Sequence, residues 1–188
     1  MHIRTLIAAA VLFTGGAAAA EDKLNDPQIA TIALTAHQID ADRGKLAQKK
    51  TKNEQVKAFA DQMVTDHTAG ANEVLALAKK LGVKVEESPV SKGLKDGAKD
   101  TAAKLGKLKG AAFDKAYVDA EVAYHQAVID AVTKVLLPAV QNAEVKKALE
   151  DAGPTLQGHL VHAQQLQTAL GEKKDEKAEK PAKAEKKN

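Results

Sequence analysis

The chain has 188 residues, no cysteine, few aromatic residues (3%) and a formal net charge of +3. The lack of cysteine excludes a disulfide framework, a thiolate metal site and lipid attachment through cysteine. Without Arg4 and the seven lysines of residues 172–188, 20 of the 28 basic residues remain, and without the five acidic residues of that segment, 20 of the 25 acidic residues remain. The part of the chain between the N-terminal segment and residue 172 is therefore neutral. Nucleic-acid binding needs a basic face with aromatic residues, so we do not expect it here.

The first twenty residues have the pattern of a secretory signal peptide. Arg4 supplies the positive charge, Leu6 to Phe13 form an apolar stretch, and Ala18 to Ala20 provide small residues before a cleavage site at Glu21. The apolar stretch is shorter than the roughly 20 residues that a membrane span needs. We therefore expect export to the periplasm of a bacterium, or secretion, with no transmembrane span after signal cleavage.

Two long helices are predicted next. Asp26 and Pro27 are typical of a helix start, with an N-cap acceptor followed by proline, and the first helix is expected to end near Lys50. Asn53 is the predicted cap of a second helix, whose apolar residues recur three and four positions apart until Gly82 ends it.

From Val83 to Gly110 the apolar pattern weakens, and we predict a connection with one or two short helices. A third long helix is expected from Ala111 to Leu137, ended by Pro138. Such a long connection allows the third long helix to run parallel to the second, as in ferritin-like bundles.

A fourth helix is predicted from its cap at Asn142 to Gly171, with a kink or short break at Gly153-Pro154. Residues 172–188 are rich in Lys, Glu and Ala with no large apolar residue, which predicts a disordered tail. The expected organisation is a signal peptide (1–20), one bundle domain (21–171) and this tail (172–188). The fold class is all-α, a ferritin-like four-helix bundle with a long crossover containing short helices between helices two and three.

Each predicted long helix carries one polar residue on its apolar stripe: Asp40, His67, His125 and His159. A buried polar group without a partner costs about 1 to 3 kcal/mol. Because a domain has only about 5 to 15 kcal/mol of stability in total, four such groups must be satisfied by each other, by water or by a cation.

A further polar or soft side chain lies near each of these residues. His37 precedes Asp40 by three, the soft side chain of Met63 precedes His67 by four, Glu121 precedes His125 by four, and His162 follows His159 by three, spacings that share a helix face. Three imidazoles and a carboxylate suit a transition-metal ion such as zinc, iron, manganese or copper. We expect Asp40, His67, His125 and His159 as metal ligands, with Asp66, Glu121, His37 and His162 as outer residues that orient them.

Two other interpretations remain open. The polar residues can form a hydrogen-bonded core or a water-filled cavity, or lie at different heights and never meet. An enzyme with His67 or His125 as general base has little support, because the chain has no nucleophile motif, no glycine-rich phosphate loop and no cysteine.

Four segments carry a resemblance to a known family: Asp40 to Ala47, Val56 to His67, Phe113 to Val118 leading to His125, and Pro154 to Leu160. They look like the exported helical family called domain of unknown function 4142, over about Asn25 to Leu170. The resemblance implies a ferritin-like fold and a location outside the cytoplasm, but no particular activity.

The chain differs from related patterns at two points. The family often has glutamate in the first helix where this chain has Asp40, which shortens the reach by one methylene. Di-iron bundles use Glu-x-x-His pairs, and this chain has none, which argues against ferroxidase or di-iron chemistry.

The leading hypothesis is a non-enzymatic exported bundle that binds one transition-metal ion, for metal binding or envelope stress tolerance. The alternative is a structural or interaction protein of the cell envelope, in which the polar core is hydrogen-bonded. In that case the charged tail would contact an anionic polymer or a protein partner.

Overall fold

The computed structural model describes residues 23–84 and 86–179, with side chains as far as residue 171. The elements are α1 (Asp26–Lys50), α2 (Glu54–Lys80), α3 (Pro89–Gly106), α4 (Gly110–Ala131), the π-helix η1 (Val132–Leu136), α5 (Leu137–Ala139) and α6 (Ala143–Glu179). Since these residues contain no strand, the all-α prediction is confirmed. The predicted signal peptide and the end of the predicted tail, residues 180–188, lie outside the described residues.

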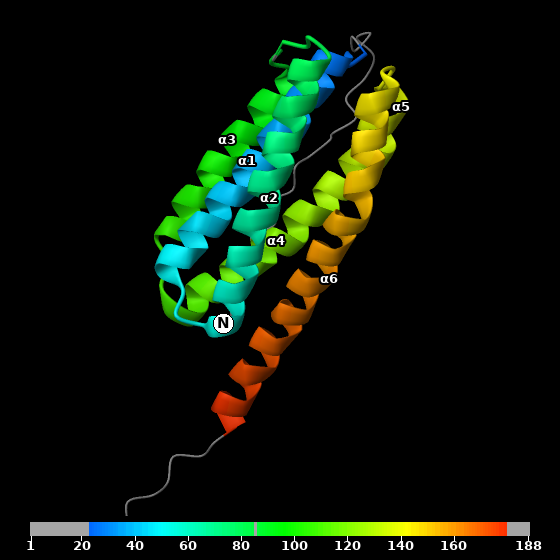
Figure 1. Ribbon diagram of the computed structural model, residues 1–188. Helices are drawn as coiled ribbons and strands as arrows, with labels where there is room; N and C mark the ends of the chain where they lie inside the picture. Colours follow the sequence, from blue (N-terminus) through cyan, green and yellow to red (C-terminus); the bar gives the residue numbers. More distant parts are fainter. Residues whose placement is uncertain (1–22, 85, 180–188) are drawn as a thin grey trace, which may run out of the picture.

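The helices form an elongated assembly in which α1 and α2 make one antiparallel hairpin and α4 and α6 make a second long pair (Figure 1). Contacts of α1 with α4 and of α2 with α6 join the two pairs. The connection predicted to hold short helices contains a single helix, α3, of 18 residues that packs along α1. Its start is defined by Ser88, whose side chain accepts a hydrogen bond from the Ser91 amide.

The start of α1 differs in detail from the prediction. The cap is Asn25 rather than Asp26: the Asn25 side chain accepts from the Gln28 amide, and the Gln28 side chain accepts from the Asn25 amide. The Asp26 carboxylate instead accepts hydrogen bonds from the backbone amides of Gln141 and Asn142, both at 2.9 Å. Asp26 thereby ties the start of α1 to the loop that precedes α6.

Three further helix boundaries follow the predicted signals. Asn53 caps α2 by accepting from the amides of Gln55 and Val56, and Asn142 caps α6 in the same way. Gly82 follows α2 with a positive φ of 65°, a conformation that glycine adopts at little cost. These local hydrogen bonds set the length of the helices independently of the packing.

The helical structure at Pro138 ends two residues later than predicted, and the break predicted as one possibility at Gly153-Pro154 does not occur. Helical structure continues past Pro138 to Ala139, because the wide turn of η1, in which the Leu137 amide bonds to the Val132 carbonyl, relieves the clash that proline causes. Pro154 lies inside α6, which is unbroken. One missing hydrogen bond is outweighed by the packing of α6 along α4 and α2.

The C-terminal end of α6 also lies further along the chain than predicted. The helix runs past Gly171 to Glu179. The residues after Gly171 are mostly Lys, Glu and Ala, whose high helix propensity favours continuation of the helix.

The buried core consists of two apolar clusters. The first is built mainly around Phe59, Met63, Phe113 and Tyr117, and the second around Ile29, Ile32, Val132 and Leu149. Along each long helix, the polar residue singled out above falls between members of the two clusters, as His159 does between Leu156 and Ala163 in α6. A polar layer therefore lies between two apolar clusters.

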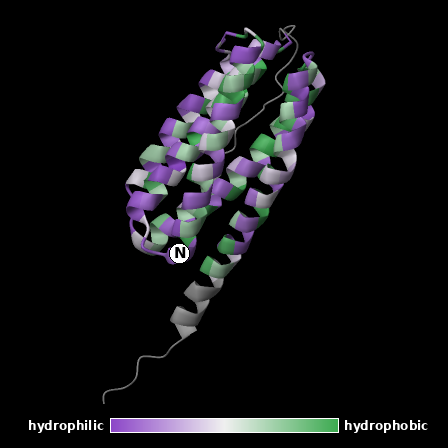
Figure 2. Ribbon diagram, in the orientation of Figure 1, coloured by the Kyte–Doolittle hydropathy of each residue, from purple (hydrophilic) through white to green (hydrophobic). Residues whose placement is uncertain are grey.

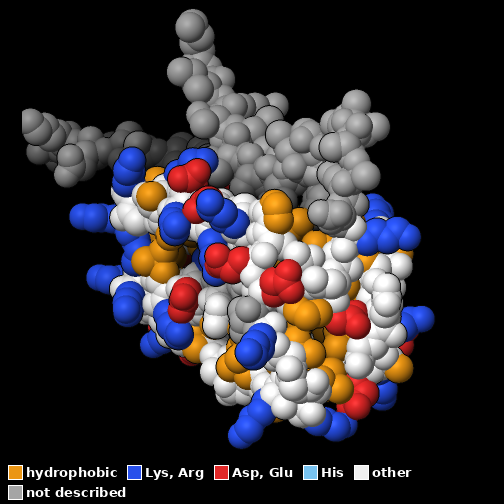
Figure 3. Space-filling model, turned by 90° about the horizontal axis from the view of Figure 1, so that it is seen from above, with side chains coloured by type: hydrophobic (Ala, Val, Ile, Leu, Met, Phe, Trp, Pro, Cys, Tyr) orange, Lys and Arg blue, Asp and Glu red, His pale blue; other side chains and the backbone are white. Residues whose placement is uncertain are grey.

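Hydrophilic and hydrophobic residues alternate along the helices, as amphipathic helices require (Figure 2). On the face seen from above, lysine and arginine side chains are interspersed with aspartate and glutamate (Figure 3). Among the described helices, none combines the length and apolar character needed to cross a bilayer.

Candidate metal centre

Four helices each bring one side chain to the polar layer: Asp40 from α1, His67 from α2, His125 from α4 and His159 from α6. The Nε2 atoms of His67 and His125 lie 3.3 Å and 3.4 Å from the same Asp40 oxygen, Oδ2. One nitrogen from each of the three histidines lies within 4.8 Å of the others. All four side chains are buried, with Asp40 and His125 fully so.

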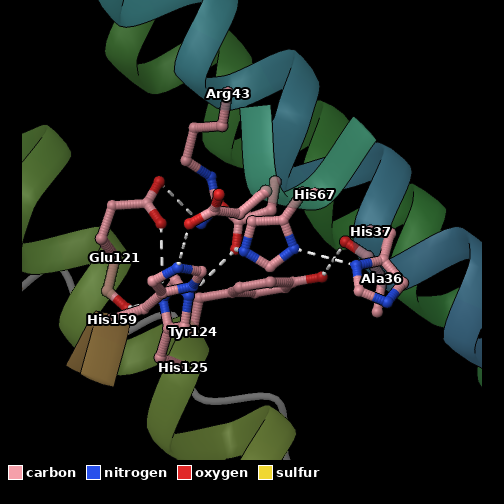
Figure 4. A network of polar contacts seen from close by, with 10 residues as sticks. Ala36, His37, Arg43, His67, Glu121, Tyr124, His125 and His159 are labelled. Atoms are coloured by element: carbon pink, nitrogen blue, oxygen red, sulfur yellow. Dashed lines mark hydrogen bonds and ion pairs between the residues drawn. The ribbon is translucent and has the colours of Figure 1, made fainter. Parts of the chain in front are cut away.

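Each of the three imidazoles is also held at its other nitrogen by a neighbour (Figure 4). The contacts are His67 Nδ1 with His37 Nδ1 at 3.0 Å, His125 Nδ1 with the backbone carbonyl of Glu121 at 3.0 Å, and His159 Nε2 with the Asp66 carboxylate at 2.9 Å. Such outer contacts fix the orientation and tautomer of metal-binding histidines.

The inward atoms, in contrast, have no hydrogen-bond partner among the described residues. They are His67 Nε2, His125 Nε2, His159 Nδ1 and both carboxylate oxygens of Asp40. Each buried polar group left in this state costs about 1 to 3 kcal/mol. A cation held by the three histidines, or by Asp40, Glu121 and His125, would satisfy several of these atoms at once.

The protonation states of His67 and His125 favour metal binding. Burial, reinforced by the nearby His125 and His37 rings, lowers the pKa of His67 to about 2. Burial also lowers the pKa of His125, against an opposing effect of the Glu121 carboxylate. Both imidazoles are therefore neutral at pH 7, which is the form that binds metal ions.

Burial raises the pKa of the Glu121 and Asp40 carboxyl groups, whereas it lowers the pKa of the histidines. Burial, with the Asp40 carboxylate as the next cause, raises the pKa of Glu121 to about 8, while the Arg43 guanidinium opposes the rise. Burial also raises the pKa of Asp40, again against Arg43. A bound cation would stabilise the ionised form of both groups, because an opposite charge nearby lowers a carboxyl pKa.

Sequence reasoning did not single out Arg43, although it lies three residues after Asp40 and so shares its helix face. Its guanidinium Nη1 lies 3.3 Å from Glu121 Oε1, and its Cζ lies 4.4 Å from the centroid of the Tyr124 ring. The Tyr124 hydroxyl in turn donates to the carbonyl of Ala36 at 2.9 Å. Burial alone would lower the pKa of Arg43, but the adjacent Glu121 and Asp40 raise it above its ordinary value.

The residues expected to surround the centre divide into two groups. His37, Asp66 and Glu121 contact the central histidines, as described above. His162 lies apart: its Nδ1 contacts the Gln62 side-chain oxygen at 3.0 Å, and its ring packs edge-on against Phe59. One turn further along α6 than His159, it contacts Gln62 and Phe59 of α2 instead of the central histidines.

The position of His37 depends on a glycine. A Cβ atom at Gly70 would lie 2.4 Å from His37 Cε1 and 2.8 Å from both ring nitrogens, closer than real Cβ contacts allow. The missing side chain therefore makes the space in which His37 reaches His67 between α1 and α2.

Two overlapping groups of side chains can hold a metal ion. The first is His67, His125 and His159, and the second is Asp40, Glu121 and His125; within each group, one ligand atom per residue lies within 4.8 Å of the others. The protein is thus an all-α protein with a buried centre of imidazoles and carboxylates.

The chain belongs to the family described as Domain of unknown function (DUF4142), whose model matches residues 13–166. This confirms the resemblance seen in the sequence. No curated protein and no solved structure matches the chain. The function must therefore be argued from the centre itself.

Proposed function

We propose that the protein binds one transition-metal ion in the polar layer, through Asp40, His67, His125 and His159. The observation that carries the proposal is the set of unpartnered inward atoms on these four side chains. Each histidine is held from outside at one nitrogen. The other nitrogen faces the polar layer without a hydrogen bond, and those of His67 and His125 lie 3.3 Å and 3.4 Å from the Asp40 carboxylate. This is the arrangement that metal-binding histidines have.

The donor set narrows the choice of ion. Three neutral imidazoles and one carboxylate suit zinc, iron, manganese or copper, whereas calcium and magnesium prefer oxygen ligands alone. Four protein ligands from four helices can complete a tetrahedron, which is typical of sites that hold an ion without an open position for a substrate. The role that fits is metal binding or tolerance of envelope stress, without catalysis.

The setting of the site supports a protein that acts outside the cytoplasm. The N-terminal sequence has the pattern of a secretory signal. Two antiparallel helix pairs joined by a long connection are compatible with a ferritin-like bundle. The Glu-x-x-His pairs of di-iron bundles are absent from the sequence, so the proposed centre is not a di-iron centre of that type.

Metal analysis of the mature chain tests the proposal. The protein is purified without a histidine tag, incubated with zinc, copper, cobalt, manganese or iron, freed of excess ion and analysed for metal per chain. His159→Gln removes a proposed ligand, and His162→Gln, one turn away on the same helix, is the matched control. We expect one ion in the wild type and in His162→Gln, and a loss of binding of at least a hundredfold in His159→Gln.

A wild-type chain that takes up none of these ions overturns the proposal. The alternative is then a structural or interaction protein with a hydrogen-bonded polar core, favoured by the short distances of His67 and His125 to Asp40. In that case, removing residues 172–188 is expected to abolish association with the envelope, and substitutions in the polar layer are expected to leave it unchanged.

A further inference from the structure

Arg43 is a buried cation at the edge of the proposed metal centre. Its side chain is 7% exposed and its guanidinium contacts Glu121, which is fully buried. Burying an arginine is unfavourable unless its charge is paired and its donors are used. The ring of Tyr124 under the guanidinium adds a cation–π contact. Arg43 is therefore held in one place by its partners.

The group that Arg43 contacts belongs to the second set of possible metal ligands. Asp40, Glu121 and His125 offer ligand atoms within 4.8 Å of one another, and this set shares His125 with the three-histidine set. Both Asp40 oxygens and Glu121 Oε2 have no hydrogen-bond partner among the described residues. His125 Nδ1 contacts the Glu121 carbonyl, so His125 has one nitrogen for one ion, and a second ion would have to be held by the carboxylates of Asp40 and Glu121.

The other Glu121 oxygen, Oε1, faces the guanidinium of Arg43 at 3.3 Å. An arginine side chain stays charged at every physiological pH, so this positive charge is permanent. A second divalent ion between Asp40 and Glu121 would lie against it, at buried side chains between the two apolar clusters. Repulsion between like charges is strong in such surroundings.

We propose that Arg43 takes the place of a second cation and so limits the centre to one metal ion. Glu121 then serves as the partner of Arg43 and is not a metal ligand. This inference rests on the proposed function, and it concerns the specificity of that site: the centre binds single divalent transition-metal ions and excludes carboxylate-bridged pairs. Because Asp40 and Arg43 lie one turn apart on α1, the same rigid helix positions the ligand and the excluding charge.

Counting ions in charge variants tests this inference. Arg43→Gln removes the charge but keeps a polar side chain, and Arg43→Lys is the matched control that keeps the charge. The mature chains are loaded with an excess of cobalt(II), freed of unbound ion and examined by native mass spectrometry, with circular dichroism as the check on folding. We expect one cobalt ion in the wild type and in Arg43→Lys, and two in Arg43→Gln. The double variant Arg43→Gln/Glu121→Gln returns to one, because the second carboxylate is lost.

A crystal of the wild-type protein grown with excess cobalt(II) provides a second measurement, which does not depend on the folding of any variant. Anomalous scattering is expected to show one peak, in contact with the three histidines, with Glu121 still paired to Arg43. A second peak between Asp40 and Glu121 overturns the inference.

The outcomes separate the two proposals. Two ions in the wild type, or one ion in a folded Arg43→Gln chain, overturn the role of Arg43 and leave metal binding intact. A wild-type chain that binds no cobalt, zinc, copper, manganese or iron overturns the proposed function and this inference with it.

Discussion

Replacing Gly70 with alanine tests whether the position of His37 depends on the space beside Gly70. The new methyl group would lie 2.4 Å from His37 Cε1, and a contact under 3.0 Å forces one of the two groups to move. Both belong to packed helices, so the movable group is the His37 ring. We expect the ring to turn away and its 3.0 Å contact with His67 Nδ1 to be lost.

The magnitude follows from two opposing effects. In an open helical position, replacing glycine with alanine stabilises a protein by up to about 1 kcal/mol. At Gly70, the lost hydrogen bond costs about 0.5 to 1.5 kcal/mol and the overpacking about 1 to 3 kcal/mol. The two costs outweigh the gain, so Gly70→Ala is expected to destabilise the protein by about 0.5 to 3.5 kcal/mol.

Urea unfolding of four variants measures the effect. Gly97→Ala, in a part of α3 where an added Cβ meets nothing within 4 Å, is the control and is expected to stabilise the protein. Gly70→Ala introduced into His37→Ala is also expected to stabilise it, because the ring that would clash is absent. Since removing an outer partner of a ligand typically weakens metal binding by about 10- to 100-fold, Gly70→Ala should weaken cobalt binding to a similar degree. Equal stabilisation by Gly70→Ala and Gly97→Ala in the wild-type background would refute the reasoning.

Two further predictions concern the metal and the histidines. A free metal concentration of about 1,000 times the dissociation constant stabilises the folded state by about 4 kcal/mol. A chelator should therefore lower the melting temperature of the metal-loaded protein by about 8 to 16 °C. A shift within the error of calorimetry argues against a bound ion. In the metal-free protein, the pKa of His67 is about 2 in the folded chain, and its ordinary value of 6.5 applies to the unfolded chain. Between pH 6.5 and 2, the unfolded chain therefore binds a proton that the folded chain does not. The contribution of His67 to the free energy of unfolding should therefore be fully present above pH 6.5 and fall by up to about 1.4 kcal/mol per pH unit as the pH drops from 6.5 toward 2. The raised pKa of Glu121 acts in the opposite direction, so the comparison with His67→Gln isolates this contribution. Urea titrations at pH 6.5, 5.5 and 4.5 should show a shallower fall in His67→Gln, and parallel lines for the two proteins would contradict the prediction.

Most helix boundaries were predictable from local chemistry. Asn53, Gly82 and Asn142 act through hydrogen bonds and backbone angles within a few residues, so short sequence signals suffice. A proline signal is less decisive, because its cost of one hydrogen bond and a local clash is set against packing along a whole helix. Pro154 shows this most clearly, since α6 passes through it unbroken.

The identity of the central residues was predictable, but their meeting was not. The three- and four-residue spacing gives the angle at which Asp40 or His67 leaves its helix, and hence that both face the interior. It does not give the height of one helix against another. Arg43 was missed because an arginine near an apolar stripe usually extends its charge into water, and only the position of Glu121 on α4 shows that it remains inside.

The sequence by itself determined the helices, their buried faces and the presence of a polar residue on each of the four long ones, because these properties depend on neighbours within one or two turns. The tertiary structure alone decided that Asp40, His67, His125 and His159 lie at one level between two apolar clusters. It also placed Arg43 among them and left His162 outside. The physical reason is that the axial offset between helices results from the packing of side chains far apart in the chain, which no local pattern records.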